Sequence, residues 1–257
     1  MEWVAFVPAL IVVAIVTIGL ILWRAAICGA GWRAWVCYQI AHLHGLLITR
    51  CSATNACTYP EHGPAIIVAN HSSPLDPMLL WFRHYSLFRV PRLRVIGFLT
   101  AKEYCVRRGI VGWVCRSMQS IPVERSGHDM APLRAALRRL QAGHLVGIFP
   151  EGRLNVTSPD EQLLPGGTGV AWLAMRSGAP VIPVFIRNSP RAESMVRAFF
   201  TRTRSTRTFG QPIEFSRGVD KKPDHRELTE NAGLIMQRLA ELGGIRPAVT
   251  TDRPNTE

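Results

Sequence analysis

The strongest hydrophobic pattern in this chain is an N-terminal stretch, Trp3 to Trp23, that contains no charged residue. Its 21 residues, rising about 1.5 Å each in an α-helix, match the roughly 30 Å hydrocarbon core of a bilayer. Tryptophan stands at both ends of the stretch, as aromatic side chains often do at membrane–water interfaces. We therefore expect residues 3–23 to form a single membrane-spanning helix.

A cleaved signal peptide is the alternative for this stretch. Signal peptides begin with a basic segment and have a shorter apolar core, whereas Glu2 is the only charge before this stretch. Arg24 and Arg33 follow it, and no lysine or arginine precedes it. Because basic flanking residues stay on the cytoplasmic side, we expect a retained anchor with the catalytic domain on the cytoplasmic face.

A second apolar segment, residues 32–48, is too short to cross a bilayer. It fits a helix lying in the membrane interface or a helix packed on the domain, and both interpretations stay open. We divide the chain into N-terminal helices over residues 1–48, a catalytic domain over 49–246 and a polar tail over 247–257.

From about residue 50 the pattern alternates between short apolar runs and amphipathic stretches. Such alternation predicts an α/β fold, a mixed sheet flanked by helices, after the N-terminal membrane-anchoring segment. Pro183 would suit a strand at a sheet edge or a strand mouth, but simple core is the stronger interpretation of Val181–Val184 taken alone. The expected strands are 65–69, 93–99, 120–123, 145–149, 181–186, 206–209 and 212–215, and the expected helices are 74–82, 129–142, 169–177 and 226–242.

The net charge of +12 favours anionic partners, such as a lipid surface or a phosphorylated substrate. The sequence has no recognised nucleic-acid motif, so we expect no nucleic-acid partner. The six cysteines include no C-x-x-C pair and no histidine at zinc-finger spacing. We therefore expect no metal site.

The first candidate for chemistry is His71 with Asp76, which directly follows the apolar run 65–69. An imidazole can take a proton from an attacking hydroxyl, and a carboxylate can hold its other ring nitrogen. Ser72 or Ser73 could instead be a nucleophile, although the G-x-S-x-G turn of serine hydrolases is missing from the sequence. The plainest interpretation is that His71 caps a helix while Asp76 is solvated.

The second candidate is the run Phe149–Arg153 at the end of another apolar strand. Arg153 can grip a phosphate with two hydrogen bonds, Gly152 lets the backbone come close to a ligand, and Glu151 can accept from a hydroxyl. Arg125 ends a third strand in a similar way. The alternatives are a surface ion pair for the first site and a solvated strand end for Arg125.

Taken in order, these segments resemble the glycerolipid acyltransferase family of the 1-acylglycerol-3-phosphate acyltransferase type. Asn70–Asp76 is similar to its N-H-x-x-x-x-D block, and Ile121–Arg125, Phe149–Arg153 and Val181–Val184 are similar to the blocks that follow. The resemblance runs from about residue 64 to 215. It implies that His71 is the general base, that Asp76 is its partner, and that the acceptor phosphate site contains Arg125, Glu151, Gly152 and Arg153.

The resemblance also implies a reaction in phospholipid biosynthesis. A fatty acyl group would pass from acyl-CoA or acyl carrier protein to the hydroxyl of a phosphorylated lysolipid at the membrane, without a cofactor. Many family members carry Ser or Thr before the arginine that here follows Gly152 directly. Another lysoglycerolipid or glycolipid acceptor therefore stays open. A non-catalytic lipid-binding scaffold and a serine-type lipid hydrolase are the competing functions.

Overall fold

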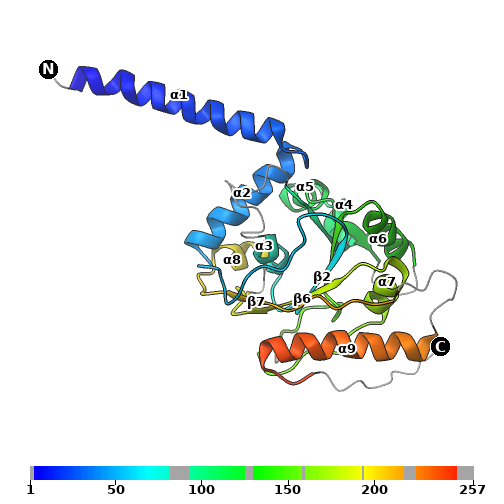
Figure 1. Ribbon diagram of the computed structural model, residues 1–257. Coiled ribbons are helices and arrows are strands. Elements are labelled where there is room, and N and C mark those ends of the chain that lie inside the picture. Colours follow the sequence, from blue (N-terminus) through cyan, green and yellow to red (C-terminus); the bar gives the residue numbers. More distant parts are fainter. Residues whose placement is uncertain are drawn as a thin grey trace.

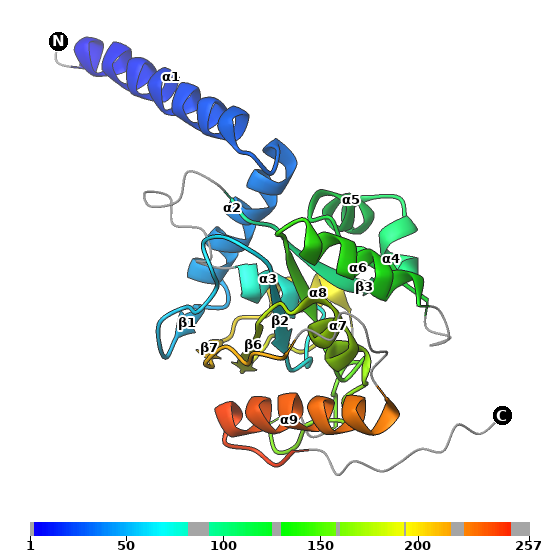
Figure 2. The same ribbon diagram turned by 45° about the vertical axis from the view of Figure 1, so that its right-hand side comes forward.

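The structure, a computed structural model, describes residues 3–81, 93–124, 130–157, 160–192, 194–216 and 224–247. Its first helix, α1 (Trp3–Ile27), projects from the domain (Figure 1 and Figure 2). Within the described residues, one helical segment is long and apolar enough to cross a membrane, Val7–Ile27, and its most apolar window is not buried.

The second helix, α2 (Trp32–Leu47), packs against the domain through one face, which includes Ala34, Tyr38 and Ala41. Its opposite face stays apolar and exposed, with Leu43 and Leu47 among the exposed side chains. The expectation of a helix packed on the domain is thus confirmed. The exposed apolar face keeps the expectation of an interfacial helix open.

The domain is built on a mixed sheet in the order β1-β7-β6-β2-β5-β3-β4. Among the strand pairings of the described residues, β6–β7 is antiparallel and the others are parallel. The expected mixed α/β sheet is confirmed. Its strands are β1 (Ser52–Ala53), β2 (Ala65–Ala69), β3 (Ile96–Ala101), β4 (Ile121–Val123), β5 (Leu145–Ile148), β6 (Val181–Arg187) and β7 (Thr206–Phe209).

Helices cover both faces of the sheet (Figure 1). The side chains of β2 contribute to a separate hydrophobic cluster on each face. Ile67 belongs to the cluster on the α2 side, whereas Ile66 and Val68 belong to the cluster with α6, α7 and α9. Both clusters draw on the same strand because successive side chains point to opposite faces. The remaining helices are α3 (Asp76–Trp81), α4 (Lys102–Val106), α5 (Ile110–Ser117), α6 (Ala131–Gln141), α7 (Gly169–Ser177), α8 (Met195–Phe200) and α9 (His225–Gly243).

The interior place of β6 confirms the interpretation of Val181–Val184 as core and rules out a sheet edge at Pro183. β6 lies between β2 and β7, and Pro183 is buried. Gly210 N donates to the carbonyl of Pro183 at 2.8 Å. A residue with an N–H would return a hydrogen bond to the Gly210 carbonyl, but Thr58 Oγ1 donates to that carbonyl instead, at 3.1 Å. A side chain thus replaces the donor that proline lacks.

Several expected elements differ from the structure. The expected strand over 212–215 is reduced to an isolated bridge between Ile213 and Val181. The strand expected from residue 93 begins at Ile96, and the helix expected from residue 74 begins at Asp76. Short elements without a clear hydrophobic period were not expected, namely β1, α4, α5 and α8.

Candidate active site

Three neighbouring strands bring the predicted chemistry to one place. β6, β2 and β5 are adjacent and parallel, so their carboxyl ends meet at the same edge of the sheet. His71 follows β2, Glu151 follows β5, and Ser189 follows β6. In open α/β sheets, ligands bind outside the carboxyl ends of the strands.

Asn70, the residue directly after β2, anchors this edge. Its side-chain amide donates to the carbonyl of Ile186 at 2.9 Å, and its Oδ1 accepts from the Ile186 N–H at 2.7 Å. The buried side chain thus continues the pairing between β2 and β6 after the β2 backbone has ended. This contact fixes the point from which the His71 loop leaves the sheet.

His71 and Asp76 are in direct contact, with 3.0 Å between His71 Nδ1 and Asp76 Oδ2. The same oxygen accepts from the backbone N–H groups of Ser72 and Ser73, each at 2.8 Å. Asp76 is fully buried, whereas the side chain of His71 keeps 19% of its exposure. The interpretation of Asp76 as a solvated residue is therefore wrong. Because the carboxylate accepts at Nδ1, we assign the proton to that nitrogen, which leaves Nε2 as the basic one.

An aromatic stack orients the imidazole from the other side. The ring centroids of His71 and Phe149 lie 4.0 Å apart with an interplanar angle of 13°, and Phe98 stacks on Phe149 at 5.2 Å. A ring held both by a face-to-face contact and by a carboxylate has little rotational freedom. The sequence placed Phe149 in a motif but did not indicate this role.

Glu151 ties three segments together through its carboxylate. Oε1 accepts from the backbone N–H of His71 at 2.8 Å, and Oε2 accepts from the N–H of Leu164 at 2.9 Å. Burial raises the pKa of Glu151, and the two backbone hydrogen bonds act against that rise. The expected contact of Glu151 with an acceptor remains a prediction. Its observed contacts position the loop that carries His71.

The two remaining residues of this motif turn away from the core. Gly152 has a φ of 67°, a left-handed conformation that favours glycine. Arg153 follows it and is exposed, so its guanidinium is accessible to an anionic group. Arg125 lies outside the described residues. The phosphate-binding roles of these residues therefore remain predictions.

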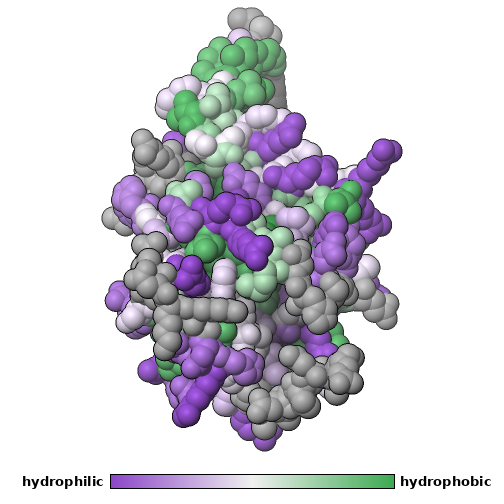
Figure 3. Space-filling model, turned by 90° about the vertical axis from the view of Figure 1, so that its right-hand side faces the viewer, coloured by the Kyte–Doolittle hydropathy of each residue, from purple (hydrophilic) through white to green (hydrophobic). Residues whose placement is uncertain are grey.

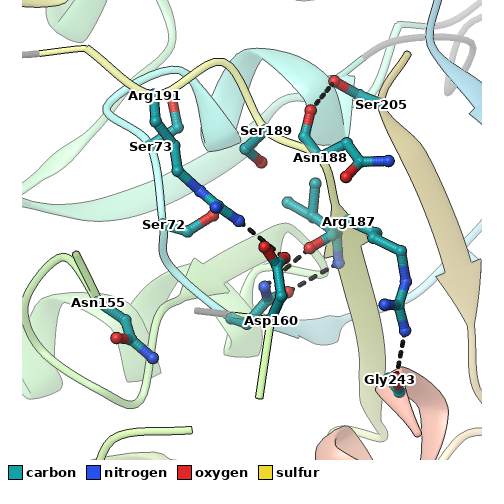
Figure 4. Close-up of polar contacts among 12 residues, drawn as sticks. Ser72, Ser73, Asn155, Asp160, Arg187, Asn188, Ser189, Arg191, Ser205 and Gly243 are labelled. Carbon is teal, nitrogen blue, oxygen red and sulfur yellow. Dashed lines mark hydrogen bonds and ion pairs between the residues drawn. The ribbon is translucent and has the colours of Figure 1, made fainter. Parts of the chain in front are cut away.

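The loop after β6 supplies contacts that the sequence did not indicate (Figure 4). Ser189 Oγ donates to Asp76 Oδ1 at 2.5 Å, and Ser73 Oγ donates to the carbonyl of Pro190 at 2.5 Å. Nearer the solvent, Arg191 forms an ion pair with Asp160 at 2.7 Å. Ser189 stands 113 residues from Asp76, so no local spacing signals this contact.

Within the described ranges of the chain, no group of three or more His, Cys, Asp or Glu side chains could hold a metal ion. All six cysteines are free, and Cys57 is exposed. That exposure differs from the burial typical of free cysteine.

Comparison with known proteins agrees with this geometry. Residues 50–187 match the family model described as Acyltransferase. N-acylphosphatidylethanolamine synthase of Arabidopsis thaliana is 31% identical over 128 residues, which cover 49% of this chain and 44% of that protein. A 1-acyl-sn-glycerol-3-phosphate acyltransferase of Borreliella burgdorferi is 23% identical over 145 residues, or 53% and 50% of the two chains. The chain thus spans half or less of the length of these relatives.

A solved structure supports the same fold. The 1-acyl-sn-glycerophosphate (LPA) acyltransferase PlsC from Thermotoga maritima superposes with a TM-score of 0.59 at 21% identity, covering 88% of this chain and 87% of that one. The family model covers more than half of the chain, and it includes both the His71–Asp76 pair and the Glu151 turn. This chain belongs to the acyltransferase family, as its motifs predicted.

Proposed function

We propose that this protein transfers a fatty acyl group from an acyl thioester to the hydroxyl of a lysophospholipid such as 1-acylglycerol-3-phosphate. The observation that carries the proposal is the contact between His71 Nδ1 and the buried carboxylate of Asp76. Such a pair provides a general base whose Nε2 is available to an acceptor. Membership of the acyltransferase family makes acyl transfer the reaction to which we assign this base.

In this proposal His71 acts without a covalent intermediate on the protein. Nε2 removes the proton of the acceptor hydroxyl while the oxygen attacks the thioester carbonyl. The C–S bond then breaks, and the imidazolium returns its proton to the departing thiolate. Asp76 stays ionised throughout and stabilises the imidazolium, as the carboxylate does in comparable histidine-based sites.

Arg153 and Arg125 are the residues we assign to the acceptor phosphate. A guanidinium offers paired donors that match phosphate geometry, and Arg153 is exposed beside the left-handed turn at Gly152. The donor is acyl-CoA or acyl carrier protein, used as a co-substrate. The proposed steps require neither a metal nor an organic cofactor.

A second acceptor is favoured by one comparison. A relative with 31% identity bears the name N-acylphosphatidylethanolamine synthase. The same base could accept a proton from the headgroup amine of phosphatidylethanolamine as it attacks the thioester. A test of the proposal therefore has to compare two acceptor classes directly, a lysolipid hydroxyl and a phospholipid amine.

Hydrolysis and a purely structural role have less support. A serine-type hydrolase needs an accessible nucleophile, but the fully buried Ser73 donates its hydroxyl proton to the Pro190 carbonyl, and Ser72 is 4% exposed. A non-catalytic scaffold would have no need of a buried Asp76 that is hydrogen-bonded to a partly exposed His71.

We also propose that α1 spans the membrane and that the domain lies on its cytoplasmic face. Arg24 and Arg33 flank the apolar helix on the domain side. The exposed leucines of α2 and the net charge of +12 add apolar and electrostatic attraction to an anionic bilayer. Figure 3 supports the assignment of α1 to the membrane and of the domain to the aqueous phase. Apolar side chains gather on the projecting helix, above a largely hydrophilic face.

The test incubates the purified protein with radiolabelled acyl-CoA, or labelled acyl carrier protein, and one acceptor at a time. The acceptors are lysophosphatidate, further lysophospholipids, a monoacylglycerol and phosphatidylethanolamine. We expect labelled diacyl phospholipid from lysophosphatidate and a much weaker signal from the monoacylglycerol, which lacks the phosphate. Release of labelled fatty acid at the same rate with and without acceptors would contradict the proposal and indicate hydrolysis.

A further inference from the structure

The two oxygens of Asp76 have different partners. Oδ2 accepts from His71 Nδ1 and from two backbone N–H groups, those of Ser72 and Ser73. Oδ1 accepts from the hydroxyl of Ser189 at 2.5 Å. Asp76 is fully buried and Ser189 is 4% exposed. A buried carboxylate oxygen that loses its donor suffers a desolvation penalty that solvent does not offset.

The residues on both sides of Ser189 are held by further hydrogen bonds. Asn188, the residue before it, adopts a left-handed φ of 55°, and its carbonyl accepts from Ser205 Oγ at 2.8 Å (Figure 4). The carbonyl of Pro190, the residue after it, accepts from Ser73 Oγ. The carbonyls of both neighbouring residues thus accept from buried serines. The hydroxyl of Ser189 is preorganised to meet Oδ1.

We propose that Ser189 is a positioning residue for the general base and acts through Asp76. This inference rests on the proposed function, in which His71 takes the acceptor proton. The hydroxyl fixes the rotation of the carboxylate, so that Oδ2 stays on Nδ1 and Nε2 keeps its direction. It also stabilises the negative charge of the carboxylate.

This role has a signature in the protonation of His71. The His71–Asp76 pair has a net charge of −1 when the imidazole is neutral and no net charge when it is protonated. A donor on Asp76 stabilises the state with net charge −1 more, so its removal should shift the pH dependence of activity to higher pH. The carboxylate of Glu151 accepts from the His71 backbone. Its effect on the protonation of the pair should be the same with and without the Ser189 hydroxyl, so it cancels in the comparison.

The test compares Ser189→Ala with Ser117→Ala in the full-length protein. Ser117 is a matched control because it is also buried and its hydroxyl donates to a backbone carbonyl, that of Trp113, away from the site. For Ser189→Ala we expect kcat to fall roughly tenfold or more, the scale of one hydrogen bond to a charged group, while KM for donor and acceptor stays within about twofold. The acid limb of the kcat/KM profile should move to higher pH. Ser117→Ala should change neither.

An activity-independent measurement separates this inference from the proposed function. The NMR signal of the proton on His71 Nδ1, which reports the hydrogen bond to Asp76, should change in Ser189→Ala only. Wild-type kcat and an unchanged Nδ1 proton signal in Ser189→Ala would overturn the positioning role, as would an equal loss in Ser117→Ala. If the wild-type protein acylates no acceptor, the proposed function fails, and the NMR measurement still decides whether Ser189 acts on the pair.

Discussion

At the scale of single residues, the site depends on carboxylates that accept from several donors each. Asp76 joins His71 to the loop after β6, and Glu151 joins the backbone of His71 to that of Leu164. Neither carboxylate projects into solvent, since Asp76 is fully buried and Glu151 is 7% exposed. Their common effect is to fix the position of one partly exposed imidazole. Rigid support of this kind is what a general base requires.

Replacing Glu151 with glutamine tests this positioning. A glutamine side chain has one oxygen, so its NH₂ group would face the backbone N–H of His71 or of Leu164. We expect kcat to fall by roughly tenfold and the free energy of unfolding to fall by about 1–3 kcal/mol, the cost of an unsatisfied buried donor. Kinetics and chemical denaturation of Glu151→Gln measure both. A variant with wild-type kcat would show that the double acceptor is dispensable.

Arg153 should act on the acceptor alone. Lysine keeps the charge but not the paired donors of a guanidinium, so we expect Arg153→Lys to raise KM for lysophosphatidate by roughly tenfold, equivalent to about 1.4 kcal/mol. KM for the acyl donor should change little, and so should KM for a monoacylglycerol, which has no phosphate. A change confined to the donor KM would contradict our assignment of Arg153.

The residue scale also shows what the sequence could reveal. His71, Asp76 and Glu151 were predicted from their places at strand ends, and the structure brings them together. The partners of these residues were not predicted. Ser189 and Leu164 reach the site only because separate loops converge at one sheet edge, and no period or spacing in the sequence records such convergence.

At the scale of elements, prediction succeeded best where an apolar run or a glycine marked the bounds of the element. β2, β7 and α7 have the predicted bounds, and Gly178 ends α7 in the left-handed conformation. The short helices α4 and α8 were missed, since a helix of one or two turns shows almost no periodicity. The core interpretation of Pro183 was right, and a proline is tolerated inside the sheet because the side chain of Thr58 donates to the Gly210 carbonyl that faces it.

The docking of α2 should depend on pH through His44. This side chain is buried against α8, with His44 Nε2 donating to the carbonyl of Phe199 at 2.7 Å. Burial lowers the pKa of His44, and the Phe199 carbonyl only partly opposes this effect. The folded state therefore keeps the ring neutral. The contribution of His44 to the free energy of unfolding should be fully present above the ordinary histidine pKa of roughly 6.5. Stability should fall as the pH drops through that value toward the lowered pKa.

Thermal unfolding of the wild type and of His44→Gln between pH 7.5 and pH 5 measures this effect. Glutamine has an amide that can donate to the Phe199 carbonyl, but it does not titrate. We expect the melting temperature of the wild type to fall more steeply with acid than that of the variant. Parallel curves would show that His44 does not contribute to the acid sensitivity.

At the scale of the whole molecule, an apolar helix projects from a basic α/β domain (Figure 1). The exposed leucines of α2 are continuous with that helix along the chain. Such a shape would hold the candidate active site, at the carboxyl ends of β2, β5 and β6, near a membrane that contains lysolipids. The arrangement fits an enzyme that takes one substrate from the bilayer and the second from the aqueous phase.

Protease access tests this orientation. In sealed vesicles with their cytoplasmic face outward, added protease should digest the domain and leave a protected N-terminal fragment that contains α1. Lysis of the vesicles should then cause no further cleavage of the domain, because the protease has already reached it from outside. A domain protected until lysis, or a mature N-terminus beyond residue 24, would contradict the proposed topology.

The central claim is that His71 is the base of an acyl transfer reaction. The most direct measurement is the rate of label transfer from acyl-CoA to lysophosphatidate by the wild type, His71→Ala and His225→Ala. His225 is an exposed histidine at the start of α9 and serves as the control. We predict that His71→Ala stays folded and loses roughly 10²–10⁴-fold in kcat, the contribution of a general base, while His225→Ala keeps the wild-type rate. Transfer by folded His71→Ala at close to the wild-type rate would contradict this account.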